Sequence, residues 1–253
     1  MDTAGSNGSK ETSSGLDAAG GAQLSIEAHG SVLSAVAHLP ARVPAPVIVC
    51  SHGLFSAKES PKFIALCEAF CRAGFCALRF DFSGCGKSPR RSGPGLVDGR
   101  KRDLAAAIAF ALKQPWSDGR IGLFGSSLGG YLSLLEADTH PELLCAVVSW
   151  SAPFEVGAKH GEELSAMYPE GLGSPTNLAG LTGAGRVLLV HGQSDEVVPW
   201  RDSVRIYRRL KDPKKLLLLR TADHRISNAS WRNTAIRETV EWFLVHISGA
   251  APF

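Results

Sequence analysis

One serine of the chain stands in a short glycine-rich segment that suits nucleophilic chemistry. Residues 125–129 read Gly-Ser-Ser-Leu-Gly and fit the pattern G-x-S-x-G, with an apolar run typical of a strand before it and a helix pattern after it. A serine on so tight a turn has strained backbone dihedrals, and the two glycines remove side chains that would clash there. Ser126 cannot centre the pattern, because Phe124 and Leu128 stand where it would need glycine. We therefore predict that Ser127 is a nucleophile.

A serine hydroxyl is a weak nucleophile unless a base takes its proton, and the chain has eight histidines as candidate bases. His224 is the predicted base, because it follows the last predicted strand on a loop that can reach over the serine. His52 and His191 each precede a glycine at a strand end, which favours a role in shaping those turns. The other histidines lack a catalytic context: His29, His38, His140, His160 and His246.

The base needs a carboxylate on its second ring nitrogen, which fixes the tautomer and orientation of the imidazole. Asp195 is the predicted acid, since it stands in the segment 191–199, His-Gly-Gln-Ser-Asp-Glu-Val-Val-Pro, just after the preceding predicted strand. The chain order Ser, Asp, His is also the order expected with this kind of serine turn. Glu196 is a weaker alternative. Asp223 is adjacent to the base and poorly placed to pair with it, and Asp81 at an earlier strand end favours a structural role.

The negative charge that develops on an attacked carbonyl oxygen needs preorganised hydrogen-bond donors, each worth about 10²–10³ in rate. The backbone N–H of Leu128, next to the predicted nucleophile, is one predicted donor. The other is expected from the loop after the first buried strand, with Leu54 as the first choice and Phe55 as the second.

A modest substrate pocket is expected beside these groups. The predicted apolar side chains of this pocket are Phe55, Phe154, Met167 and Trp200. Arg225, next to the predicted base, is open to two interpretations: it favours an anionic leaving group, or it forms a structural ion pair.

Strands and helices alternate along the chain, which predicts an α/β fold with a mostly parallel sheet flanked by helices. An edge hairpin is expected at 23–40, and the later strands at 46–50, 75–80, 121–124, 145–150, 187–190 and 215–219. Helices are expected at 61–72, 97–113, 128–137, 203–210 and 230–247. The expected domain is 23–248, preceded by a flexible tail at 1–22. The insertion after the sixth strand, 151–185, contains one short helical piece at 162–167 and is predicted to be a lid rather than a floppy loop.

The composition excludes several other classes of protein. A formal net charge of +3 is too small to suggest nucleic acid as the main partner, and no apolar stretch approaches the ~20 residues of a membrane helix. The six cysteines form no CxxC pair and no zinc-site spacing, so we expect free thiols, no metal and a cytoplasmic location. The Gly-Lys-Ser at 86–88 is not a phosphate loop, because Asp81 stands where that pattern demands glycine.

Taken together, these motifs resemble those of the α/β-hydrolase superfamily over nearly all of residues 23–248. The matching segments are His52-Gly53-Leu54, the 81–88 segment, the G-x-S-x-G turn and the 191–199 segment. The ending Asp223-His224-Arg225 is similar to that of a smaller subset, the palmitoyl-protein thioesterase and acyl-glucuronide esterase group. The resemblance implies hydrolysis of an ester, thioester or amide through an acyl-enzyme, with no cofactor.

The function predicted from the sequence is that of a serine hydrolase, of carboxylesterase or thioesterase type, which cleaves short- to medium-chain acyl esters or thioesters of small molecules. Two alternatives stay open. An aminopeptidase-like serine hydrolase would use acidic residues near the lid, Glu155, Glu162 and Glu163, to hold a substrate amine. A non-catalytic binding module on the same fold would have been free to lose these motifs. The sequence does not specify an oligomeric state.

Overall fold

The fold is described from a computed structural model, which covers residues 20–90, 95–156, 162, 166, 168–174 and 176–248. The strands are β1 (Ala22–Ala28), β2 (Ser31–His38), β3 (Ala45–Ser51), β4 (Cys76–Phe80), β5 (Ser117–Ser126), β6 (Leu144–Trp150), β7 (Val187–Gly192) and β8 (Lys214–Leu219). The helices are α1 (Pro61–Arg72), α2 (Leu96–Leu112), α3 (Leu128–Thr139), α5 (Arg201–Tyr207) and α6 (Ala229–Phe243), and α6 continues into a π-helical turn, η1 (Leu244–Ser248).

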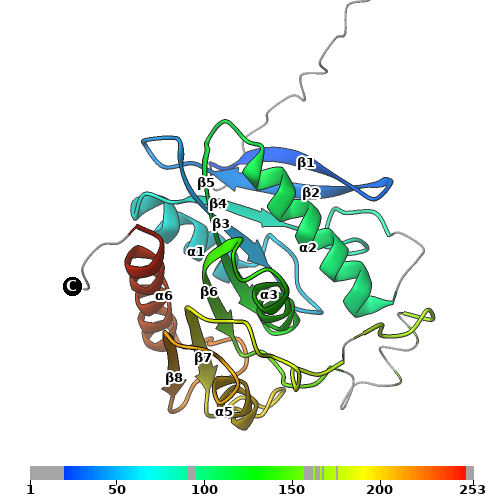
Figure 1. Ribbon diagram of the computed structural model, residues 1–253, viewed down its shortest axis with the longest axis vertical. Helices are drawn as coiled ribbons and strands as arrows, with labels where there is room; N and C mark the ends of the chain where they lie inside the picture. The colour runs from blue at the N-terminus through cyan, green and yellow to red at the C-terminus, as the bar shows by residue number, and fades with distance from the viewer. Residues whose placement is uncertain are drawn as a thin grey trace, which may run out of the picture.

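All eight strands form one sheet in the order β1-β2-β4-β3-β5-β6-β7-β8 (Figure 1). The hairpin β1–β2 and the pair β2–β4 are antiparallel, and every later pair is parallel. This arrangement confirms the predicted α/β fold with an edge hairpin. Buried from end to end, β3 and β7 read as continuous apolar runs because helices cover both of their faces.

The helices divide the core into two apolar layers, one on each face of the sheet (Figure 1). Side chains of α2, α3 and α5 pack on one face, and those of α1 and α6 pack on the other. The aromatic residues of the second layer meet edge to face, as Phe124 does with Phe63 and Trp150 at ring-centroid distances of 5.6 and 5.2 Å. This packing fixes the strand ends that carry the candidate site.

Three element boundaries differ by at least three residues from the sequence-based expectation, and one of them is the end of α5, which lies at Tyr207 rather than at 210. β5 begins at Ser117 rather than at 121, because Ser117 pairs with Ala45 of β3. A register shift separates this pair from the next one, Val47 with Ile121. The last helix ends at Phe243, where η1 takes over. None of the helices in the described ranges is long and apolar enough to cross a membrane.

Both ends of the insertion 151–185 pack onto the domain. Phe154 and Leu178 are buried in the core, and an isolated antiparallel bridge joins Glu155 to Asn177. Most of the predicted helical piece, 163–165 and 167, lies outside the described residues, as do 1–19 of the predicted tail. The lid therefore stays a prediction.

Candidate active site

Four loops meet at the carboxyl edge of the parallel strands. They follow β3, β5, β7 and β8, and the carboxyl ends of parallel strands open onto a common crevice. Ser51 pairs with Gly125, so the loop after β3 lies against the turn after β5. A Cβ placed on Gly53 would meet the Cβ of Ser127 at 3.2 Å, which shows how closely the first loop approaches the predicted nucleophile.

Ser127 occupies the strained turn expected of it. Its backbone has φ 55° and ψ −122°, a left-handed conformation that a serine rarely adopts. The flanking glycines make the turn possible, because a Cβ on Gly125 would clash with the carbonyl of Gly129, and one on Gly129 would clash with the carbonyl of Ser51. The N–H of Ser127 donates to the carbonyl of Trp150 at 2.7 Å, which ties the turn to β6.

His224 and Asp195 complete a chain of hydrogen bonds that starts at this serine. The Ser127 hydroxyl lies 3.2 Å from His224 Nε2, and His224 Nδ1 lies 2.8 Å from Asp195 Oδ2. Because a carboxylate only accepts, Nδ1 carries the proton and Nε2 is left to accept from the serine. The structure therefore brings together the three residues that the sequence predicted as nucleophile, base and acid.

The Asp195 carboxylate is buried and fully occupied by donors. Its Oδ1 accepts from the N–H groups of Val197 at 2.9 Å and Val198 at 2.7 Å. Burial acts to raise the pKa of Asp195, but the hydrogen bonds from His191, His224 and Val198 outweigh it and hold that pKa well below the usual range. Asp195 is therefore a carboxylate throughout the neutral range.

The two competing acids point elsewhere. Glu196 is exposed and accepts from the backbone N–H of His224 at 3.3 Å, not from its ring. Asp223 accepts from the N–H of Ser227 at 2.7 Å. Neither makes a hydrogen bond to the imidazole, which agrees with the preference for Asp195.

Sequence reasoning missed the second histidine on this carboxylate. His191 is fully buried, and its Nε2 lies 3.0 Å from both Asp195 Oδ2 and the carbonyl of Val198. Two acceptors at Nε2 require the proton there, so Nδ1 accepts from the Ser203 hydroxyl at 2.7 Å. His191 thus helps to hold the acid in place, a role that its position before a glycine did not indicate.

The two predicted oxyanion donors come from two different segments: Leu128 directly follows Ser127, and Leu54 follows Gly53, which lies against Ser127. Within the described part of the chain, no protein group accepts a hydrogen bond from the backbone N–H of Leu54 or of Leu128. Both residues line the cavity described below. Their role as oxyanion donors stays a prediction.

A cavity of about 740 Å³ opens over the serine. Its apolar lining includes Leu54, Phe55, Phe63, Leu128, Pro153, Val156, Val197, Val198 and Pro199. Phe55, with 55% of its surface exposed, stands at the rim. The cavity therefore offers an apolar wall beside the serine.

Two of the predicted pocket residues do not line this cavity. Phe154 is buried beneath Arg205, whose guanidinium lies 3.7 Å from the ring centroid and takes the lining position. Trp200 directly precedes α5, and the guanidinium carbon of Arg201 lies 4.8 Å from the centroid of its ring. Met167 lies outside the described residues.

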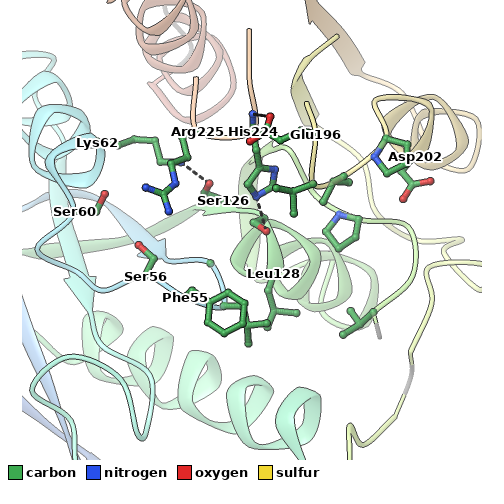
Figure 2. Close-up of a pocket in the computed structure, with 18 of the residues that line it drawn as sticks. Phe55, Ser56, Ser60, Lys62, Ser126, Leu128, Glu196, Asp202, His224 and Arg225 are labelled. Carbon is green, nitrogen blue, oxygen red and sulfur yellow. Dashed lines mark hydrogen bonds between the residues drawn. The ribbon is translucent and has the colours of Figure 1, made fainter. Parts of the chain in front are cut away.

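One end of the cavity gathers cations and hydroxyl groups that the sequence did not point to as a set. Figure 2 shows Lys62 and Arg225 together on one side, opposite Asp202, with three serines around them: Ser56, Ser60 and Ser126. Lys62 Nζ donates to Ser126 Oγ at 2.7 Å. No carboxylate of the described residues forms an ion pair with Lys62 or Arg225, so the structural ion pair considered for Arg225 is not found.

The environment of the Lys62 amine disfavours its protonated, charged form. Burial, followed by the nearby charge of Arg225, lowers the pKa of Lys62 to about 8, although Asp223 and Asp195 act in the opposite direction. Across the described residues, no group of three or more His, Cys, Asp or Glu side chains is arranged to hold a metal ion.

The comparisons with known proteins agree with this architecture. The family profile described as the alpha/beta hydrolase fold matches residues 46–169. The human mitochondrial palmitoyl-protein thioesterase ABHD10 is 25% identical over 222 residues, which cover 72% of this chain and 67% of that protein. The pig acylamino-acid-releasing enzyme is 25% identical over 246 residues, 86% of this chain but only 34% of that enzyme.

Solved structures show the same fold. Est1E from Butyrivibrio proteoclasticus with bound ferulic acid superposes with a TM-score of 0.73 at 21% identity, covering 89% of this chain and 99% of that chain. Mouse alpha/beta hydrolase domain-containing protein 10 superposes with a TM-score of 0.65 at 21% identity, covering 86% and 96%. Together, the family profile, the curated relatives and the shared fold support placing the chain in the α/β-hydrolase superfamily.

Proposed function

We propose that the protein is a serine hydrolase that cleaves acyl esters or thioesters through an acyl-enzyme. The observation that carries this proposal is the unbroken chain of hydrogen bonds from Ser127 through His224 to Asp195 beneath an open cavity. A neutral imidazole held in one tautomer by a buried carboxylate is what a serine hydroxyl needs to become a nucleophile.

The chemistry follows from this geometry in two halves. The Ser127 oxygen attacks the substrate carbonyl while His224 Nε2 takes its proton, and the N–H groups of Leu54 and Leu128 bind the oxygen that becomes negative. His224 then gives that proton to the departing alcohol or thiol, which leaves an ester on Ser127. Water then attacks this ester while His224 Nε2 takes its proton, the bond between the acyl carbon and Ser127 Oγ breaks, and His224 returns the proton to Oγ. The carboxylic acid is released and Ser127 is regenerated.

We expect the cavity to favour acyl groups of limited length. Burying a methylene contributes about 0.8 kcal/mol, or roughly fourfold in kcat/KM, for as long as apolar wall remains to be covered. That wall is interrupted by charged side chains at both ends, Lys62 and Arg225 on one side and Glu155, Asp202 and Arg205 on the other. Chains that outgrow it therefore meet charge or water.

In a series of p-nitrophenyl esters, kcat/KM is expected to rise from acetate, peak at about four to eight carbons and fall for longer chains. Thioesters of the same acids should follow the same order. A steady rise to palmitate, or activation at an oil–water interface, would contradict the short-chain proposal and favour a long-chain thioesterase, the activity in the name of the human relative.

Aminopeptidase-like cleavage is the second candidate. Glu155 and Asp202 line the cavity and could hold a substrate amine, and the pig relative is named for releasing acylamino acids. Aminoacyl p-nitroanilides belong in the same assay. If kcat/KM were higher for these amides than for the esters, aminopeptidase-like cleavage would become the favoured function.

Substrates that carry a carboxylate should be preferred over matched neutral ones, because Lys62 and Arg225 offer two cations without a carboxylate partner among the described residues. The measurement is the ratio of kcat/KM for an ester bearing a carboxylate to that for its carboxamide analogue. Since the pKa of Lys62 is about 8, this ratio should fall as the pH rises through 8 and the amine loses its charge. It should stay above one, because Arg225 remains charged.

The titration of the triad affects kcat/KM for both substrates equally, so it cancels in their ratio. In Lys62→Met the ratio should be lower at pH 7 and should no longer change near pH 8. Lys211→Met, a change of an exposed lysine outside the cavity, serves as the matched control. A ratio near one in the wild-type protein would remove charge selection from the proposal and leave the esterase activity untouched.

A further inference from the structure

A buried arginine lies behind the loop that follows β3. Arg100, on α2, is 3% exposed, and its guanidinium carbon lies 4.8 Å from the centroid of the Phe82 ring. Its Nη1 donates to the carbonyl of Gly53 at 3.3 Å, and its Nη2 to the carbonyl of Leu54 at 3.2 Å. Nη2 also reaches Cys85 Sγ at 3.2 Å and the Tyr168 hydroxyl at 3.4 Å.

The partners of this cation are all neutral in the part of the chain that the structure describes. Its hydrogen bonds go to two carbonyls, a thiol and a phenol, and no carboxylate forms an ion pair with it. Burying a guanidinium without a counter-charge is unfavourable, and fold stability alone would be served as well by an apolar side chain of similar volume. Stabilisation of the fold therefore does not explain why an arginine occupies position 100.

Arg100 instead fixes the orientation of the peptide between Gly53 and Leu54. The Gly53–Leu54 peptide is trans, so its C=O and N–H point in opposite directions. With the Gly53 carbonyl turned toward Arg100, the N–H of Leu54 is turned away from it, and Leu54 lines the cavity above Ser127. The bond to the Leu54 carbonyl fixes the next peptide plane in the same way.

His52 acts as a second clamp on the same carbonyl. Its Nδ1 donates to Gly53 O at 2.7 Å, and its Nε2 accepts from the N–H of Phe82 at 3.2 Å. Burial, followed by the charge of Arg100, lowers the pKa of His52 to about 3, so the ring stays neutral with its proton on Nδ1. The Gly53 carbonyl is therefore held by two donors, one from α2 and one from the residue that precedes it in the loop.

We propose that Arg100 is a positioning residue of the oxyanion hole, holding the Gly53–Leu54 peptide so that the Leu54 N–H faces the reacting carbonyl. This inference rests on the proposed hydrolase function. The fixed positive charge behind the peptide also strengthens the peptide dipole that meets the developing negative charge, and this electrostatic contribution grows in a buried site. Both effects act in the transition state and leave the bound substrate almost untouched.

The test compares Arg100→Met and Arg100→Lys with the wild-type protein. Losing an oxyanion donor costs about 10²–10³ in rate, so losing its orientation in Arg100→Met should lower kcat roughly 10- to 100-fold while KM changes less than about threefold. Arg100→Lys, which keeps the charge but can hold fewer carbonyls, should fall in between. A trifluoromethyl ketone forms a tetrahedral adduct with Ser127 and should bind more weakly by the same factor as kcat falls. The matching trifluoromethyl carbinol, which cannot form the adduct, should bind as before.

Arg79→Met provides the matched control, because Arg79 is a buried arginine that donates to Lys58, Glu59 and His38, none of which lines the cavity. It should lower the melting temperature without changing the ratio of ketone to carbinol affinity. Folded Arg100 variants that keep this ratio, or that lose ketone and carbinol affinity alike, would overturn the proposal. Should Arg100→Met fail to fold, Arg100→Lys and Arg100→Gln carry the same test. A wild-type protein that neither turns over esters nor binds the ketone would instead overturn the hydrolase function itself.

Discussion

Replacing Ser127 by alanine is expected to abolish ester turnover and labelling by a fluorophosphonate probe while leaving the fold intact. Only the hydroxyl oxygen is lost, and that oxygen bonds to His224. Because the members of such a triad act as a unit, removal of the nucleophile should lower kcat by about 10⁶-fold. Any residual rate would come from binding and the oxyanion donors alone.

The adjacent serine supplies the control for this prediction. In Ser126→Ala the probe should still label the protein, and mass spectrometry should locate the label on Ser127. The melting temperatures of both variants should stay close to that of the wild-type protein. More than a few per cent of wild-type activity in Ser127→Ala would mean that the nucleophile lies elsewhere, and an unlabelled wild-type protein would favour a non-catalytic binding module.

Asp195→Asn is expected to cost about 10⁴-fold in kcat at neutral pH. An asparagine that turns its amide N–H toward His224 Nδ1 would stabilise the tautomer with the proton on Nε2, which cannot accept from Ser127. The same change alters one of the two acceptors of His191 Nε2 and leaves the carbonyl of Val198 as the other. The depressed pKa of Asp195 also stabilises the fold above the ordinary aspartate pKa of about 4, and this stabilisation is lost as the pH falls toward the native value. The variant should therefore show a weaker loss of stability in acid.

Glu196→Gln is the matched comparison, since it changes the neighbouring acid in the same conservative way. Glu196 bonds to the backbone of His224 and not to its ring, so its loss should cost less than about tenfold in kcat. Steady-state kinetics at pH 7 and urea unfolding from pH 7 down to about pH 2 test both variants. If Glu196→Gln lowered kcat more than Asp195→Asn, the acid of the triad would be Glu196 and not Asp195.

The sequence by itself determined the order of elements and the strand ends at which chemistry could occur. The alternation of apolar runs with helical periodicity is a local signal, and so is the glycine spacing around Ser127. Asp195 and His224 could be found because each follows a predicted strand, and parallel strands bring their carboxyl ends together whatever their separation in the chain. That rule turned three distant segments into one expected site, and the structure places their side chains within hydrogen-bond distance.

The tertiary structure alone decided which other side chains turn toward the serine. Phe154 and Arg205 are distant in sequence, and only their packing shows that the arginine lines the cavity and covers the phenylalanine. Lys62 meets Arg225 at the cavity because α1 and the loop after β8 converge there, and neither residue has a local pattern that indicates this. Arg100 reaches Gly53 across 47 positions of the chain. Side-chain direction within an element depends on rotamer and packing, which periodicity does not encode, so specificity and positioning residues emerge only from the folded chain.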